Sequence, residues 1–202
     1  MLPIAPEGRL LLLTAAALAA VVHYFFGAAV AAPFWGLTVL VLIMFRIVPR
    51  HVQASPLGIV SPVDGHVTAV HRQTDPFLKR DSLVIELEQR LLGEFNIHSP
   101  TEGRVMDVWY PGANPEQPGR FAVRVQTDEG DDVVVAIGVG GWTSVVHCSL
   151  QTGHRIGQGH RCGFAGFLRP VTIYLPANSQ PQVQAADRVR WGRSVLALLR
   201  HE

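Results

Sequence analysis

The longest run of apolar positions lies near the N-terminus. Residues 10–45 contain no Asp, Glu, Lys or Arg. One helix crosses a hydrocarbon core of about 30 Å with about 20 residues, so this run is too long for one crossing and short for two. Gly27 and Pro33 interrupt it near its middle. The pattern therefore predicts an N-terminal transmembrane α-helical hairpin, with one helix over about residues 10–26 and the other over about residues 31–45.

Basic residues flank this run on both sides, with Arg9 before it and Arg46 and Arg50 after it. A hairpin places both flanks on one face of the membrane, and positively charged flanks stay on the cytoplasmic side. We therefore expect an integral protein of the cell membrane, with residues 1–51 as the anchor and residues 52–202 on the cytoplasmic side. A cleavable signal peptide is the alternative, but it leaves the second half of the apolar run unexplained.

After residue 52 the pattern changes to short runs of β-branched residues separated by Gly and Pro. Runs of this length and spacing are typical of strands in a β-sandwich or barrel. The only helical pattern in this part is weak and covers residues 191–200. We expect a mainly β domain with a barrel-sandwich-like arrangement. The predicted strands cover residues 66–70, 82–88, 104–110, 120–127, 132–139, 144–150 and 171–176.

One short repeat occurs within the β region. SPVDGHVTAV (61–70) and SPTEGRVMDV (99–108) share Ser, Pro, Gly and two Val residues, and Asp64 corresponds to Glu102. In such a turn Pro fixes φ, and Gly takes a permissive backbone conformation. The repeat predicts two equivalent turns, each opening a strand, in a pseudo-symmetric β fold.

Composition excludes some classes of function. Hydrophobic residues make up 48% of the 202 residues, charged residues make up 16%, and the formal net charge is +1. This excludes a polycation that binds nucleic acid. Cys148 and Cys162 form no CxxC pair and are expected to be reduced thiols. The spacings around His147 and Cys148, and around His154, His160 and Cys162, match no structural zinc pattern, so no metal is expected.

Five motifs follow one another along the chain in a recognisable order. PIAPEGRLLLL opens the apolar run, and FRIVPR (45–50) is similar to the pattern FFRDPxR without its Asp. SPVDG (61–65) is similar to SPADG, and FNIHSPTEGRV (95–105), followed by YPG, is similar to HxxHxPxxGxV. GFAGFLRPVTIYLP (163–176) aligns without a gap to G-x-I-R-F-G-S-R-V-D-x-Y-L-P. Over nearly its whole length the chain resembles the phosphatidylserine decarboxylase family in its short, membrane-anchored bacterial and archaeal form.

The resemblance implies a proenzyme that cleaves itself at a Gly-Ser bond and turns the Ser into a pyruvoyl group, the electron sink for decarboxylation. In the family an Asp and a His assist that Ser, and Asp64 and His98 fall on these two catalytic positions. The Gly-Ser position falls on Leu168 and Arg169, and no Gly-Ser dipeptide occurs anywhere in the chain. Arg has no hydroxyl group, so no pyruvate cofactor is expected.

Each candidate residue also has a purely structural interpretation. His98 is equally compatible with a hydrogen-bonded position at a strand end, and Asp64 with a turn carboxylate that caps nearby amides. Arg169 either lies on the surface or projects into the former active site. Residues 143–150 align where the family carries an Arg-Arg pair, and the loss of that pair weakens phosphate binding.

We interpret the chain as a phosphatidylserine decarboxylase-related membrane protein of phospholipid metabolism that is non-catalytic or altered in function. The expected partners are the membrane and a phospholipid with a phosphatidylserine-like head group, without nucleic acid. This interpretation allows two kinds of protein partner: other copies of the same chain, in a homo-oligomer, or an active paralogue. The competing hypothesis is an active lyase that converts phosphatidylserine to phosphatidylethanolamine with a carbonyl from another source. A third is a structural, membrane-anchored β-domain.

Overall fold

A computed structural model describes residues 4–52, 55, 57–91, 93–113, 116–117, 119–138, 147–148 and 150–200 of the chain. The chain divides into two compact units, Met1–Pro49 and Arg50–Glu202. The first unit contains one helix, α1 (Pro6–Met44), and the regular structure described in the second consists of strands. We call the second unit the β-domain. The protein is therefore mainly β with an N-terminal helical segment, as the sequence predicts.

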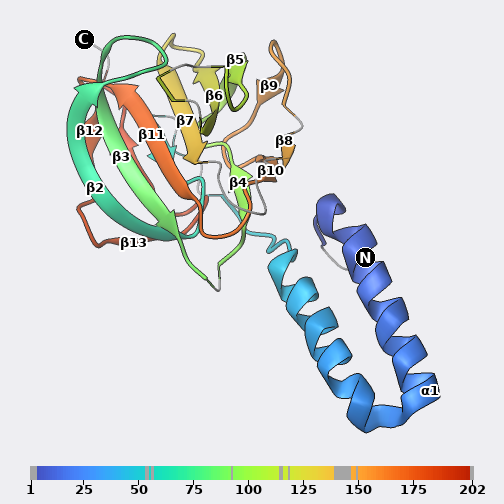
Figure 1. Ribbon diagram of the computed structural model, residues 1–202. Coiled ribbons are helices and arrows are strands. Elements are labelled where there is room, and N and C mark those ends of the chain that lie inside the picture. The colour runs from blue at the N-terminus through green and yellow to red at the C-terminus, as the bar shows by residue number, and fades with distance from the viewer. Residues whose placement is uncertain are drawn as a thin grey trace. The chain divides into compact units, whose positions relative to one another are not determined.

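α1 is a long apolar helix that is broken at Gly27. Gly27 has φ 79° and ψ 175°, a conformation that suits glycine because it has no Cβ. The ends of the two arms that lie away from Gly27 contact each other. The Ala5 N–H donates to the Phe45 carbonyl oxygen at 2.8 Å, and Ile4 and Arg46 form an antiparallel bridge. The segment is thus a helical hairpin (Figure 1) that bends at a residue expected from the sequence to interrupt it.

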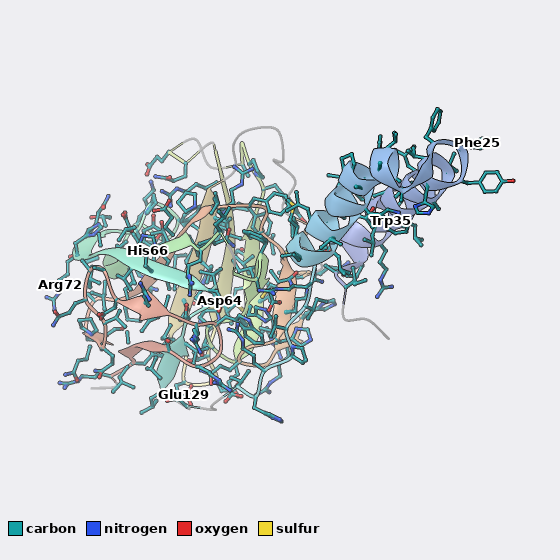
Figure 2. The ribbon with its side chains drawn as sticks, turned by 90° about the horizontal axis from the view of Figure 1, so that it is seen from below. Phe25, Trp35, Asp64, His66, Arg72 and Glu129 are labelled. Carbon is teal, nitrogen blue, oxygen red and sulfur yellow. The ribbon has the colours of Figure 1, made fainter. Side chains whose placement is uncertain are left out.

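By length and composition, α1 is the helix of the described chain that is long and apolar enough to cross a membrane. Its arms cover residues 6–26 and 28–44, or about 32 and 26 Å at about 1.5 Å per residue, against a hydrocarbon core of about 30 Å. Large apolar side chains are exposed on both arms, including Phe25 and Trp35 (Figure 2). Exposed apolar side chains of this kind are expected on a helix that is surrounded by lipid.

The β-domain contains fourteen strands in its described residues. In chain order they are β1 (Gly58–Val60), β2 (Gly65–Thr74), β3 (Asp81–Gln89), β4 (Asn96–His98), β5 (Gly103–Trp109), β6 (Arg120–Gln126), β7 (Asp132–Gly138), β8 (His147–Cys148), β9 (Arg155–Ile156), β10 (Arg161–Phe164), β11 (Pro170–Pro176), β12 (Gln180–Pro181), β13 (Arg188–Val189) and β14 (Val195–Leu198). The predicted strands that correspond to β2, β3, β5, β6, β7 and β11 are confirmed. β8 lies within the predicted strand 144–150, whose residues 144–146 and 149 are outside the described residues.

Eight of these strands form one curled antiparallel sheet in the order β13-β2-β3-β11-β7-β6-β5-β9 (Figure 1). Two three-stranded sheets, β1-β14-β12 and β4-β10-β8, accompany it. Along the chain, β1, β2, β3, β11, β12, β13 and β14 correspond in turn to β4, β5, β6, β7, β8, β9 and β10. Under this correspondence the two halves of the large sheet, β13-β2-β3-β11 and β9-β5-β6-β7, have the same strand order, and so do the two small sheets. The fold is therefore pseudo-symmetric, as the sequence repeat predicts.

The two repeated turns share their local structure but differ in surroundings. The Ser of each turn donates its hydroxyl to the carbonyl oxygen two residues later, at 2.7 and 2.6 Å. The turns begin side by side, since the His98 N–H donates to the Pro62 carbonyl oxygen at 3.0 Å. Asp64 is then buried, whereas its counterpart Glu102 is exposed. Only one of the two equivalent turns brings its acidic residue into the interior.

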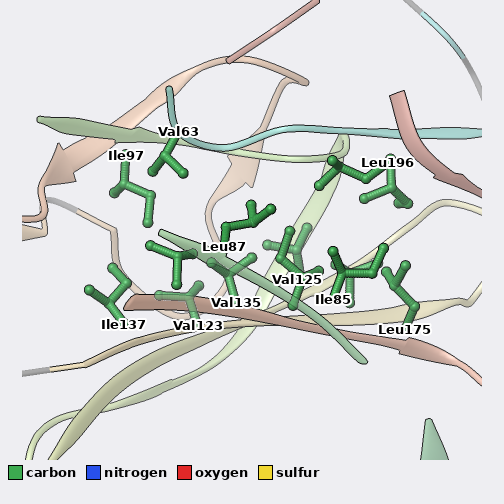
Figure 3. Close-up of a cluster of buried hydrophobic side chains, with 14 of the residues drawn as sticks. Val63, Ile85, Leu87, Ile97, Val123, Val125, Val135, Ile137, Leu175 and Leu196 are labelled. Atoms are coloured by element: carbon green, nitrogen blue, oxygen red, sulfur yellow. The ribbon is translucent and has the colours of Figure 1, made fainter. Parts of the chain in front are cut away.

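Alternate residues of the long strands point into a large apolar core, because side chains along a strand alternate between the two faces of a sheet. The opposite face of the same strands carries a smaller buried cluster of Val84, Ala122, Val134, Ala136 and Tyr174. Figure 3 shows part of the large core, to which the loops and small sheets also contribute. Its labelled members are Val63, Ile85, Leu87, Ile97, Val123, Val125, Val135, Ile137, Leu175 and Leu196. The core fixes the ends of β3, β4 and β11, where the candidate site lies.

The helical pattern at residues 191–200 is a wrong prediction. Residues 195–198 form β14, which pairs with β1 on one side and with β12 on the other. Backbone hydrogen bonds to two neighbouring strands outweigh the weak local preference of the sequence for helix. The strands β1, β4, β12 and β13 have no counterpart in the sequence prediction, because two or three residues are too few to display a period.

Candidate functional site

Asp64 ends a turn before β2 and has a buried carboxylate that is fully engaged. Arg50 donates to it through two nitrogens, Nη1 to Oδ1 at 2.6 Å and Nη2 to Oδ2 at 2.8 Å. The backbone N–H of Trp191 donates to Oδ1 at 3.1 Å, and that of Glu94 approaches Oδ2 at 3.5 Å. A carboxylate has about four acceptor positions, so these donors fill its capacity. Both oxygens of the Asp64 side chain are therefore occupied by donors from the protein.

Arg50 is the cation that neutralises this carboxylate. Its paired, two-nitrogen geometry matches the planar guanidinium to the carboxylate. The hydrogen bond to Asp64 raises the pKa of Arg50, and burial opposes that effect. The guanidinium carbon also lies 5.3 Å from the centre of the Trp191 ring, within range of a cation–π interaction. Arg50 thus holds together the Asp64 turn and the turn around Trp191.

Glu94 and His98 form a second buried pair beside the first. The Trp191 Nε1–H donates to Glu94 Oε2 at 2.8 Å, and Asn96 Nδ2 donates to Glu94 Oε1 at 2.7 Å. His98 Nε2 lies 3.3 Å from the same Oε1. The Glu94 side chain is completely buried. A carboxylate at such a depth is stable only with these partners, because an unpaired buried charge is costly.

Both ring nitrogens and one face of His98 are occupied. Nδ1 lies 3.0 Å from the carbonyl oxygen of Gly159, which can only accept, so Nδ1 carries a proton. Nε2 faces the Glu94 carboxylate. The ring stacks on Trp191 with 3.6 Å between centroids and 2° between planes. In this arrangement both His98 ring nitrogens face oxygen atoms of the protein.

The segment before β11 meets the Asp64 turn at one end of β3. The Arg169 N–H donates to Gln89 Oε1 at 3.0 Å, and Gly65 pairs with Gln89 from the other side of the strand. Leu168 has a φ of 50°, which is unusual for a residue with a side chain. Asp64 and Arg169 therefore flank the same strand end, and in Figure 2 Asp64 lies near the middle of the β-domain seen from this end.

Proteins with similar sequences share one name. This chain is 34% identical to the phosphatidylserine decarboxylase proenzyme of Ralstonia nicotianae, over 97% of this chain and 95% of that protein. It is 34% identical to the Nitrosomonas eutropha protein and 32% to the Aromatoleum aromaticum protein of the same name, each over 84% of this chain and 83% of the relative. The chain belongs to the phosphatidylserine decarboxylase family. No family model and no solved structure matches it.

The structure brings the three positions of the phosphatidylserine decarboxylase pattern to one end of the β-domain. Asp64 and His98 are linked through Glu94 and Trp191, and position 169 adjoins the end of β3 to which the Asp64 turn is bonded. Pyruvoyl formation requires a hydroxyl at position 169, where this chain has a partly exposed Arg169. The residues present do not fit that group.

The cysteine and histidine residues considered for zinc show no metal centre. In the described part of the chain no group of three His, Cys, Asp or Glu side chains is arranged to hold a metal ion. Cys162 is buried, and burial raises its pKa well above the ordinary thiol value. Cys148 is partly buried, and burial raises its pKa as well. The side chain of His147 lies outside the described residues.

Sequence reasoning missed three members of the site: Arg50, Glu94 and Trp191. In the sequence, Arg50 stands out only as a positive flank of the apolar run. Glu94 lies within the apolar stretch before FNIH, and a charge in such a place is a signal for a buried, paired group. Trp191 gives no such signal, since its partner Asp64 lies 127 residues away in sequence.

Proposed function

We propose that this chain is a membrane-anchored member of the phosphatidylserine decarboxylase family that does not form the pyruvoyl group and has no decarboxylase activity. The observation that carries the proposal is Leu168-Arg169 in place of the Gly-Ser pair. Decarboxylation leaves electrons that need a sink, and the family makes that sink from the Ser hydroxyl and its peptide bond. An arginine side chain has no oxygen at Cβ, so the same conversion is not available to it.

The surroundings of Asp64 and His98 give independent support. A base that activates a hydroxyl must lie within hydrogen-bond reach of it with a free acceptor. The Asp64 carboxylate is filled by donors from Arg50 and two backbone amides, and both His98 nitrogens face oxygen atoms. These contacts favour a role in holding the fold together. Retention of the family site as a structural core is compatible with binding a phospholipid such as phosphatidylserine without converting it.

The proposal predicts that the purified full-length protein converts no phosphatidylserine to phosphatidylethanolamine in mixed vesicles. Mass spectrometry of the extracted lipids measures the product, and the Ralstonia nicotianae relative serves as the positive control. Product above the level of protein-free vesicles, lost on Asp64→Ala, would overturn the proposal in favour of a lyase with another source of carbonyl.

The helical hairpin is proposed to anchor the protein with both ends on the cytoplasmic side. Arg9 precedes the apolar run, and Arg46 and Arg50 follow it. Both ends of a hairpin with positive flanks are retained inside. The β-domain is then cytoplasmic, because it follows directly from the second flank.

Single-cysteine labelling in intact cells tests this topology. The exposed positions Pro6, Ala29 and His51 are suited to it, whereas Gly8 is not, because a Cβ there would lie 2.2 Å from the Phe45 side chain. In a Cys148→Ser background we expect positions 6 and 51 to be protected from a membrane-impermeant maleimide until the cells are opened. Labelling of one of these two positions from outside would mean a single crossing.

A further inference from the structure

Two large apolar side chains are exposed in neighbouring turns at one end of the β-domain. Leu91 is 70% exposed in the turn after β3, and Leu168 is 47% exposed in the turn before β11. The hydrogen bond from the Arg169 N–H to the Gln89 side chain, at 3.0 Å, joins these two turns. Both lie at the lower end of the β-domain in Figure 1. We call this end the leucine end.

Exposed arginines accompany the two leucines. Arg90 directly precedes Leu91, and its backbone N–H donates to the Asp64 carbonyl oxygen at 3.0 Å. Arg190 and Arg193 are exposed in the turn around Trp191, whose N–H donates to the Asp64 carboxylate. Three cationic side chains therefore border the turn that carries Asp64.

The acidic residues of the leucine end do not offset this charge. Asp64 is buried and paired with Arg50, and Glu94 is buried among its hydrogen-bond donors. Two exposed acidic residues lie near this end: Glu88, which is 3.6 Å from His66, and Asp187, whose carbonyl oxygen accepts from the Val67 N–H. They are fewer than the three exposed arginines. The exposed charge of this end is thus mainly positive, and it surrounds an apolar tip.

We propose that the leucine end docks on an anionic bilayer surface, with Leu91 and Leu168 in the interfacial layer and the three arginines against lipid phosphates. Apolar side chains among basic residues are the combination that binds such surfaces. The chain itself supports this choice of partner, because Arg50 directly follows the apolar unit and is fixed to Asp64 at this same end. The inference rests on the proposed anchoring of the hairpin and is independent of catalysis.

Fluorescence quenching on the full-length protein in vesicles of phosphatidylcholine and phosphatidylglycerol tests the docking. A polarity-sensitive dye is placed on Leu91→Cys, on Leu168→Cys or, as the matched control, on Glu129→Cys, each in a Cys148→Ser background. Cys162 stays unlabelled because it is buried and its pKa is raised. Glu129 lies in the turn between β6 and β7, at the other end of the central strands.

We expect nitroxide-labelled lipids to quench the dye strongly at positions 91 and 168, and aqueous iodide to quench it several-fold more at position 129. Equal quenching by iodide at all three positions would overturn the docking. Protection of positions 91 and 168 from both quenchers would also overturn it, because the leucines would then lie in a protein contact. Retention of the protein in carbonate-washed membranes shows separately that the anchor holds.

The charge requirement is tested by the Arg90→Gln, Arg190→Gln and Arg193→Gln variants, each with the dye at position 168. In anionic vesicles each change should weaken the docking equilibrium by about fivefold, the effect of one basic residue near such a surface. In vesicles of phosphatidylcholine alone the variants and the parent should behave alike. Absence of any effect in anionic vesicles would overturn the assignment of an anionic surface as the partner.

Discussion

Replacing Arg50 by alanine is expected to lower the free energy of unfolding of the β-domain by about 3–5 kcal/mol, the range for removing one partner of a buried ion pair. The change leaves the Asp64 carboxylate, whose side chain is 9% exposed, without its two-nitrogen partner. Urea unfolding of the full-length protein in detergent, followed by circular dichroism, measures the loss.

Arg155→Ala is the matched control for this experiment. Its ion pair with Asp128 is exposed on both sides, at 69% and 57% of the side chains. Exposed pairs contribute about 0–1 kcal/mol, so this variant should unfold close to the parent. The double change Arg50→Ala with Asp64→Asn should cost less than the sum of the two single changes, because the charge left unpaired is removed. Equal losses for Arg50→Ala and Arg155→Ala would contradict the described site.

Replacing Trp191 by alanine is expected to lower the same free energy by about 3–5 kcal/mol, the range for truncating a buried aromatic residue. The loss includes the stack on His98 and the Nε1–H bond to Glu94. Trp191→Phe keeps an aromatic ring that can stack on His98, and it removes the Nε1–H donor together with the second ring of the indole. We expect about 2 kcal/mol for that change, as for a hydrogen bond to a charged group. If Trp191→Phe left the free energy of unfolding unchanged, the hydrogen bond from Trp191 to the Glu94 carboxylate would contribute nothing to stability, and this part of the account would be wrong.

The long strands could be predicted from the sequence, and the short ones could not. β3 buries Leu83, Ile85, Leu87 and Gln89 on one face, so its alternation is visible in the sequence. β14 is visible only through its neighbours β1 and β12, and residues 191–200 therefore suggest a helix until the fold is known. The helical hairpin could be predicted from the sequence because residues 10–45 carry no Asp, Glu, Lys or Arg and Gly27 interrupts this run.

The candidate site could be predicted only in part from the sequence. Motif order gave Asp64, His98 and position 169 as three positions of one site. It did not give the partners that occupy Asp64 and His98, because those contacts arise from packing between distant segments. The Arg50 bond to Asp64 spans 14 residues, and the Gly159 bond to His98 spans 61. What Asp64 and His98 contact decides whether they are available for chemistry, and only the fold shows it.

The intact mass of the purified full-length protein tests the absence of self-cleavage most directly. We expect a single chain near 22.1 kDa, because Arg169 supplies no hydroxyl for the cleavage. The measurement needs no substrate and no assumption about the lipid. Two chains, the smaller beginning at residue 169 with a blocked terminus, would contradict the proposal that this family member forms no pyruvoyl group.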